Sequence, residues 1–219
     1  YYIQPSTAPA PLLISNGWTD DLFPVDEALR FYNRTRATFP DSPISLFFLD
    51  YGHQRGQGKT ADTALLKARQ EDWFAYYLKG DHGKRPFVGV ETLTQTCPKA
   101  APSGGPYFAD SWSEIHPGEV RFASAAQQAI VSPGSPVVGQ AFDPISGPGA
   151  CATADGADQQ GVATYRLPAA TGAGYTLMGS PTIIASLTAL AANDPVAARL
   201  LDVAPDGTER LVARGPYGA

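Results

Sequence analysis

Two side chains with acid–base chemistry each follow a short apolar run of the sequence. Asp20 comes after the run at residues 11–15, and His53 comes after the run at residues 44–49. Such runs are typical of buried strands, and neighbouring parallel strands lie about 5 Å apart with their carboxyl ends at one edge. A carboxylate beside an imidazole fixes the ring's tautomer and stabilises its protonated form, as the general base of a nucleophilic enzyme requires. The sequence therefore predicts a catalytic Asp20–His53 pair.

Other carboxylates and histidines fit this arrangement less well. Asp20 stands at the fourth position of a Gly-x-x-Asp-x-x-x-Pro pattern, and its neighbour Asp21, out of that register, is the alternative partner for the histidine. A single aspartate in a turn usually serves the local backbone. On that basis Asp50 is interpreted as a turn cap, and His82 and His116 are interpreted as loop histidines. The joint order of strand, Asp, strand and His favours the functional interpretation of Asp20.

The remaining patterns do not indicate a bound cofactor. The sequence has no His-x-x-x-His, Cys-x-x-Cys or EF-hand spacing, so we expect neither a metal ion nor another cofactor. Residues 56–60 partly match a phosphate-binding loop but lack its first glycine. Trp18 is interpreted as a core aromatic or, because it neighbours Asp20, as the wall of a substrate pocket.

The elements that must position the Asp–His pair alternate along the first 80 residues. A strand at residues 11–15 is followed by a helix that begins after Pro24 and fades near residues 36–37. A second strand at residues 44–49 is followed by a helix at residues 62–78, with Gly80 at its C-terminal end. This order predicts an α/β domain over residues 1–82, with a parallel sheet covered on both faces.

Residues 86–219 have a different character, and we place the domain boundary between Gly80 and Pro86. Helical periodicity mostly disappears, and short alternating runs at residues 87–90, 118–122 and 163–167 are separated by Gly- and Pro-rich stretches. Short strands between turn signals are typical of an all-β sandwich. The sequence therefore predicts an α/β domain followed by an all-β domain.

Composition narrows the classes of partner. The 219 residues carry 16 Lys and Arg against 21 Asp and Glu, a net charge of −5, and no basic stripe indicates nucleic-acid binding. The longest apolar run, at residues 183–192, is too short for a bilayer span of about 20 residues, so no membrane segment is expected. The composition fits a soluble acidic protein.

The two cysteines, Cys97 and Cys151, allow a single disulfide, with two free buried thiols as the alternative. A bridge closing a loop of this length would stabilise the fold by about 4 kcal/mol on the chain-entropy model. A disulfide indicates an oxidising compartment. With the few lysines and the Ala-, Gly-, Pro- and Thr-rich loops, it favours an extracellular or secreted protein.

The Asp–His pair lacks an evident nucleophile. In α/β-hydrolases the chain order is Ser, then Asp or Glu, then His, with the serine in a Gly-x-Ser-x-Gly turn. None of the thirteen serines has glycine at both flanking positions of that pattern. The turn is expected upstream of these residues, and these residues alone are expected to be inactive.

Several motifs resemble those of the X-Pro dipeptidyl-peptidase and cocaine-esterase-like hydrolases, over nearly the whole chain. In the first part the resemblance rests on residues 16–20 and 52–53. In the second part it rests on Trp112 with residues 116–119, and on residues 175–181 and 201–207.

The resemblance implies that residues 1–82 are the C-terminal part of an α/β-hydrolase domain, followed by a jelly-roll sandwich. It implies that Asp20 and His53 belong to a Ser-Asp-His triad that cleaves peptide or ester bonds. The serine would come from a missing N-terminal hydrolase segment in the same or another chain. The jelly roll stops before its last strands in this pattern, so open sheet edges are expected.

A non-catalytic β-sandwich that binds a ligand or partner is the alternative, because a fold does not fix a function. An exposed aromatic strip on one sheet face, with Asp20 and His53 far apart or buried in unrelated contacts, would favour this alternative. The separation of these two side chains therefore discriminates between the two hypotheses.

Overall fold

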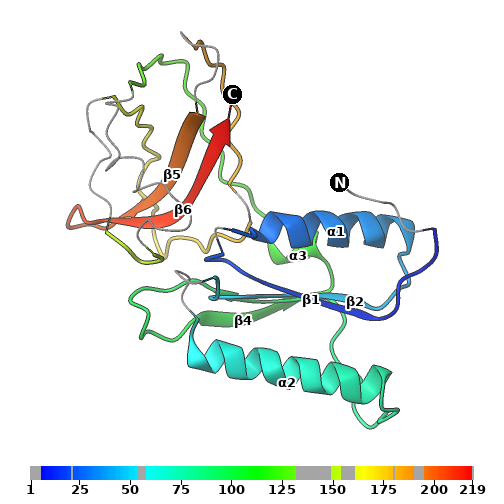
Figure 1. Ribbon diagram of the computed structural model, residues 1–219. Coiled ribbons are helices and arrows are strands. Elements are labelled where there is room, and N and C mark those ends of the chain that lie inside the picture. Colours follow the sequence, from blue (N-terminus) through cyan, green and yellow to red (C-terminus); the bar gives the residue numbers. More distant parts are fainter. Residues whose placement is uncertain are drawn as a thin grey trace. The chain divides into compact units, whose positions relative to one another are not determined.

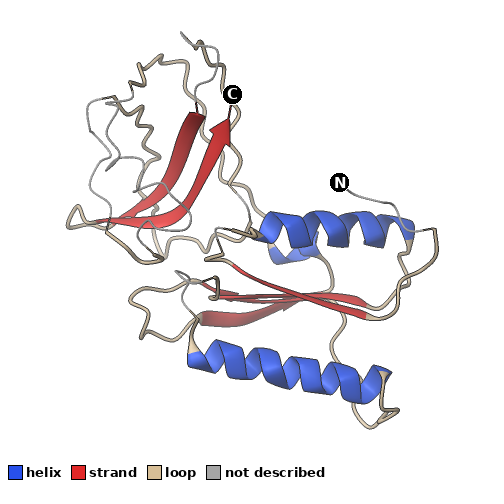
Figure 2. Cartoon of the chain, viewed as in Figure 1, coloured by secondary structure: helices blue, strands red, loops and turns tan. Residues whose placement is uncertain are grey.

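The computed structural model describes residues 6–20, 22–53, 58–131, 149–153, 161–179, 181–189 and 195–218. The chain divides into two compact units, Tyr1–Ile115 and His116–Ala219. The first unit contains the helices and a four-stranded sheet, and the second contains a two-stranded sheet (Figure 2).

The sheet of the first unit has the strand order β1-β2-β3-β4. The strands β1 (Leu12–Gly17), β2 (Ile44–Leu49) and β3 (Val90–Thr94) run parallel, and β4 (Gly104–Ala109) pairs antiparallel with β3 at the edge. The predicted parallel pairing of the first two strands is confirmed. Their register aligns the last residues of both strands, Gly17 with Leu49.

Two long helices cover opposite faces of this sheet, as Figure 1 shows. Helix α1 (Val25–Thr38) connects β1 to β2, and helix α2 (Thr60–Tyr77) connects β2 to β3. The first turn of α1 contains Asp26 and Glu27, and their negative charges interact favourably with the positive N-terminal end of the helix dipole. Gly80, just beyond α2, has a φ of 73°, the left-handed conformation that commonly ends a helix. Both predicted helices are confirmed.

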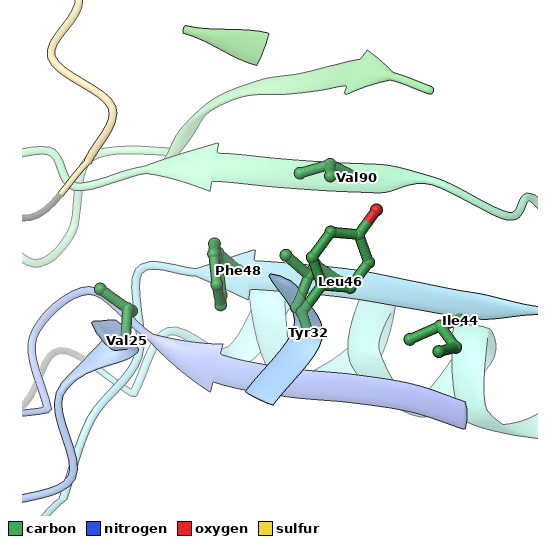
Figure 3. Close-up of a cluster of buried hydrophobic side chains, with 6 residues drawn as sticks. All are labelled: Val25, Tyr32, Ile44, Leu46, Phe48 and Val90. Carbon is green, nitrogen blue, oxygen red and sulfur yellow. The ribbon is translucent and has the colours of Figure 1, made fainter. Parts of the chain in front are cut away.

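The period-two alternation of β2 divides its side chains between the two helices. All six residues of β2 are buried. Phe47 and Leu49 pack on the α2 side with Leu65 and Leu66. The α1 side holds a cluster drawn from α1, β2 and β3, shown in Figure 3: Val25, Tyr32, Ile44, Leu46, Phe48 and Val90. An apolar run without polar alternation is therefore the signature of a strand covered on both faces.

The domain boundary differs from the predicted one. The first unit extends to Ile115, so residues 86–115, which the sequence assigned to the β domain, belong with the α/β part. Val90 pairs with Leu46 of β2, and β4 extends the same sheet. The loss of helical periodicity after residue 86 marks the last strands of the first sheet and not a new domain. A short helix, α3 (Trp112–Ile115), then packs Trp112 on the α1-side cluster.

The second unit contains a hairpin of β5 (Pro195–Val203) and β6 (Glu209–Gly218). Its turn is formed by part of the motif at residues 201–207. Gly207 has a φ of 85°, and Asp206 Oδ1 accepts a hydrogen bond from the Thr208 N–H at 2.9 Å. Turn chemistry of this kind requires glycine and aspartate at such positions.

The predicted strands at residues 118–122 and 163–167 do not form regular ladders. Residues 126–131 and 161–165 nevertheless run side by side in opposite directions. The Gln128 amide donates to Thr164 O and accepts from Thr164 N, at 2.8 and 2.9 Å, and Val131 N donates to Gly161 O at 3.0 Å. The Gln128 side chain thus bonds the Thr164 backbone groups that a neighbouring strand's backbone would bond in a regular ladder. The jelly roll stays a prediction.

Phe48 is expected to be critical for the first unit. It is fully buried, and its ring makes edge contacts with Trp18 at 5.1 Å and Trp112 at 5.7 Å. Phe48→Ala should lower the free energy of unfolding by about 3–5 kcal/mol, because it leaves a cavity between two aromatic rings. All three tryptophans lie in this unit, so tryptophan fluorescence in a urea titration reports its unfolding.

The matched control is Phe74→Ala, on the outer face of α2, where the side chain is 52% exposed. It should change the unfolding free energy by no more than about 0.5 kcal/mol. Equal effects of the two substitutions would contradict the packing described for Phe48.

Candidate active site

Asp20 and His53 meet at the carboxyl ends of β1 and β2. Asp20 Oδ2 lies 2.6 Å from His53 Nδ1. The Asp20 side chain is 5% exposed and the His53 side chain is 47% exposed. The loops after the two strands therefore bring together a buried carboxyl group and an imidazole that reaches solvent, as the order of residues along the chain predicted.

The second oxygen of Asp20 fixes the orientation of the carboxylate. Asp20 Oδ1 accepts hydrogen bonds from the backbone N–H groups of Leu22 at 3.1 Å and Phe23 at 2.9 Å. Asn16 holds the same turn, since its side-chain amide donates to Phe23 O at 3.1 Å. Because the turn binds Oδ1, Oδ2 is left for His53.

The hydrogen bond to Asp20 decides the tautomer of His53. A carboxylate oxygen accepts, so we assign the ring proton to Nδ1. Nε2 then carries the lone pair on the opposite side of a half-exposed ring, where it can take a proton from another molecule or segment. The Phe23 ring lies beside the imidazole, with 5.0 Å between the ring centroids.

Two glycines allow the Asp20 and His53 loops to approach this closely. A Cβ atom on Gly17 would lie 1.8 Å from Tyr51 O, and one on Gly52 would lie 2.4 Å from Thr19 O. The backbones are also bonded directly, from Thr19 N to Tyr51 O at 3.1 Å. The glycines of both site motifs are therefore explained by close backbone approach.

From the sequence, Trp18 is interpreted as a core aromatic or as a pocket wall, and its contacts are those of a core aromatic. Its indole N–H donates to Leu93 O at 2.6 Å, and its ring packs against Phe48 in the α1-side cluster. The polar end of the side chain is thus bound to β3. The alternative interpretation as a pocket wall is not supported by these contacts.

A buried ion pair next to the site was not predicted. Asp50, the residue after β2, is fully buried, and its Oδ2 lies 2.8 Å from Lys59 Nζ. Burial raises the pKa of Asp50, while hydrogen bonds from Lys59 and the Thr96 N–H act in the opposite direction. Asp50 is therefore part of an ion pair and not the simple turn cap expected. The two residues stand nine positions apart, on either side of a loop, so helical and strand spacings contain no signal for this pair.

The same ion pair overturns the phosphate-loop alternative for residues 56–60. The Lys59 ammonium is buried, and besides Asp50 it donates to Thr96 Oγ1 at 2.5 Å and Ala101 O at 2.7 Å. Its three donors are used within the protein. Residues 56 and 57 of that pattern lie outside the described residues.

The other predicted residues have varied outcomes. Asp21, the alternative partner for His53, lies outside the described residues. His82 is exposed, with its ring against Tyr76. Cys97 and Cys151 are both disulfide-bonded, so the alternative of two free thiols is wrong.

Neither a metal cluster nor a membrane helix is found in the described part of the chain. Its His, Cys, Asp and Glu residues form no group of three that could hold a metal ion. Among its helices, none has the length and apolar character needed to cross a membrane.

Gly52→Ala should separate the two loops. The added methyl group meets backbone atoms of Thr19 and Asp20, which cannot move aside as a flexible side chain can. We expect a loss of about 1–3 kcal/mol in unfolding free energy and disappearance of the downfield NMR resonance of the His53 Nδ1 proton. Gly118→Ala is the control, because a Cβ atom there meets nothing within 4 Å. An unchanged resonance in the Gly52 variant would contradict the close approach.

Comparison with known proteins finds no relative of this chain. The chain matches no family model, no curated protein and no solved structure.

Proposed function

We propose that this chain supplies the Asp and His of a serine hydrolase that works by acyl transfer. The observation that carries the proposal is the 2.6 Å contact between Asp20 Oδ2 and His53 Nδ1, at the carboxyl ends of adjacent parallel strands. Open α/β sheets hold their sites at this edge. The buried carboxylate and the half-exposed ring are arranged as a positioned general base requires.

In this mechanism His53 Nε2 takes the proton of a serine hydroxyl while the serine oxygen attacks an ester or amide carbonyl. Asp20 stabilises the imidazolium that forms. His53 then returns the proton to the leaving group as the carbon–oxygen or carbon–nitrogen bond breaks. In the second half of the cycle His53 activates a water molecule, which hydrolyses the acyl-enzyme.

The serine comes from outside these 219 residues, in the same or another chain. The absence of a Gly-x-Ser-x-Gly pattern supports this part of the proposal. The chain alone is then inactive, because the nucleophile and the oxyanion hole supply most of the barrier reduction. The motif resemblance suggests peptides cleaved after proline, or acyl esters, as substrates.

The proposal includes an all-β jelly-roll domain after the α/β part and an extracellular location. The disulfide-bonded state of Cys97 and Cys151 supports an oxidising compartment. The alternative of a non-catalytic binding module would be favoured by Asp20 and His53 lying far apart or buried in unrelated contacts. Their contact favours the hydrolase.

The proposal is tested by activity of the protein expressed together with its serine-bearing segment. Asp20→Asn should lower kcat about 10⁴-fold, because the amide favours the wrong tautomer of His53. His53→Ala should abolish hydrolysis of p-nitrophenyl acetate and of an X-Pro p-nitroanilide. Hydrolysis of one substrate and not the other identifies the substrate class.

His82→Ala is the matched control, an exposed histidine of the same unit, and it should keep full activity. The absence of a Gly-x-Ser-x-Gly segment, both from the gene that encodes these residues and from every chain that co-purifies with its product, would contradict the proposal. So would a His53→Ala variant that remains as active as His82→Ala.

A further inference from the structure

The loop that carries His53 is pinned at its base by the Asp50–Lys59 ion pair. Asp50 is the first residue after β2, and Lys59 is the last residue before α2. Their side chains meet at 2.8 Å, with 0% and 6% of each side chain exposed. The chain therefore enters and leaves the His53 loop at one fixed, buried point.

The ion pair is itself fixed to the connection between β3 and β4. Lys59 Nζ donates to Thr96 Oγ1 at 2.5 Å and to Ala101 O at 2.7 Å. The Thr96 N–H donates to Asp50 Oδ2 at 3.0 Å. The end of β2, the start of α2 and the β3–β4 connection thus converge on one ammonium group and one carboxylate.

A second buried carboxylate completes this polar cluster. Asp62, in the first turn of α2 and 4% exposed, accepts the Asp50 N–H at 3.1 Å and the Ser103 hydroxyl at 2.8 Å, both on Oδ2. The backbone at Asp50 is therefore held from α2 as well as through its own side chain. Apolar packing would bury the backbone at Asp50 but would not fix its orientation, as these directional hydrogen bonds do.

We infer that Asp50 and Lys59 are positioning residues for His53, and that they set the geometry of its hydrogen bond to Asp20. Gly52 allows the loop to lie against the Asp20 loop on one side. The ion pair binds the loop to the β3–β4 connection on the other side. The catalytic consequence rests on the proposed function, whereas the geometric consequence does not. Misplacement of a reacting group by about 1 Å costs rate without necessarily changing substrate binding.

The test uses a double variant, Asp50→Asn with Lys59→Met. Either single substitution would leave a buried polar or charged group without its partner, whereas removing both charges often leaves stability nearly unchanged. We expect the folded double variant to show about tenfold faster exchange of the His53 Nδ1 proton with water, measured by NMR on the 219-residue chain. In the hydrolase, kcat should fall about 10²-fold with little change in KM.

Arg69 and Glu91 provide the matched control pair. They form a two-pronged salt bridge between α2 and β3, at 2.7 and 2.9 Å, and neither belongs to the His53 loop. Arg69→Met with Glu91→Gln should leave the exchange rate of the His53 Nδ1 proton unchanged. An equal change in both double variants would overturn the inference, since it would indicate a general loss of stability.

Thr96→Val keeps the inference testable if the Asp50–Lys59 double variant does not fold. It removes the hydroxyl that accepts from Lys59 and donates to Pro102 O, with little change of shape, and it keeps the N–H donor to Asp50. Exchange of the His53 Nδ1 proton should then rise severalfold. Unchanged exchange in a folded variant of either kind would overturn the inference. Altered exchange without any hydrolase activity would retain the positioning role and reject the proposed function alone.

Discussion

The site depends on the parallel pairing of β1 with β2. Their register ends both strands at the same level, so the loops that follow must cross the same edge of the sheet. Gly17 and Gly52 then let the two backbones touch, where any side chain would collide with a carbonyl group. The 2.6 Å contact between Asp20 and His53 follows from these two constraints together. If one strand were shifted by a single position, the two side chains would no longer lie opposite each other.

Buried hydrogen bonds and an ion pair surround the contact between Asp20 and His53 and fix the orientation of both loops. Each oxygen of Asp20 has a separate partner, the turn for Oδ1 and the imidazole for Oδ2. The Asp50–Lys59 ion pair lies at the base of the other loop, where its charges are removed from water. Such a pair contributes little net stability, because the cost of desolvation offsets the attraction. Its contribution here is orientation, since each hydrogen bond fixes the backbone of a different segment.

The apolar core and the polar edge are divided along the same strand. The apolar residues of β2 bury their side chains on the α1 side or the α2 side of the sheet, and charged side chains begin at Asp50. The packed strand therefore ends one residue before Asp50 of the ion pair and four residues before His53. A site held at the end of a fully packed strand has little freedom to move, which suits a base that must face one fixed direction.

The local elements and the pairing of Asp20 with His53 follow from the types and order of the residues. The apolar runs marked β1 and β2, the acidic first turn and Gly80 marked the helices, and the order of residues placed Asp20 beside His53. Each of these depends on neighbours in the chain or on the fixed geometry of one strand–helix–strand unit.

The fold is needed to see how β3 and β4 join the first sheet, which bonds Trp18 makes, and that Lys59 is buried against Asp50. These features depend on which segment fills the space beside a strand end. That choice is made by packing and hydrogen bonding between residues far apart in the chain, for which composition and periodicity contain no signal.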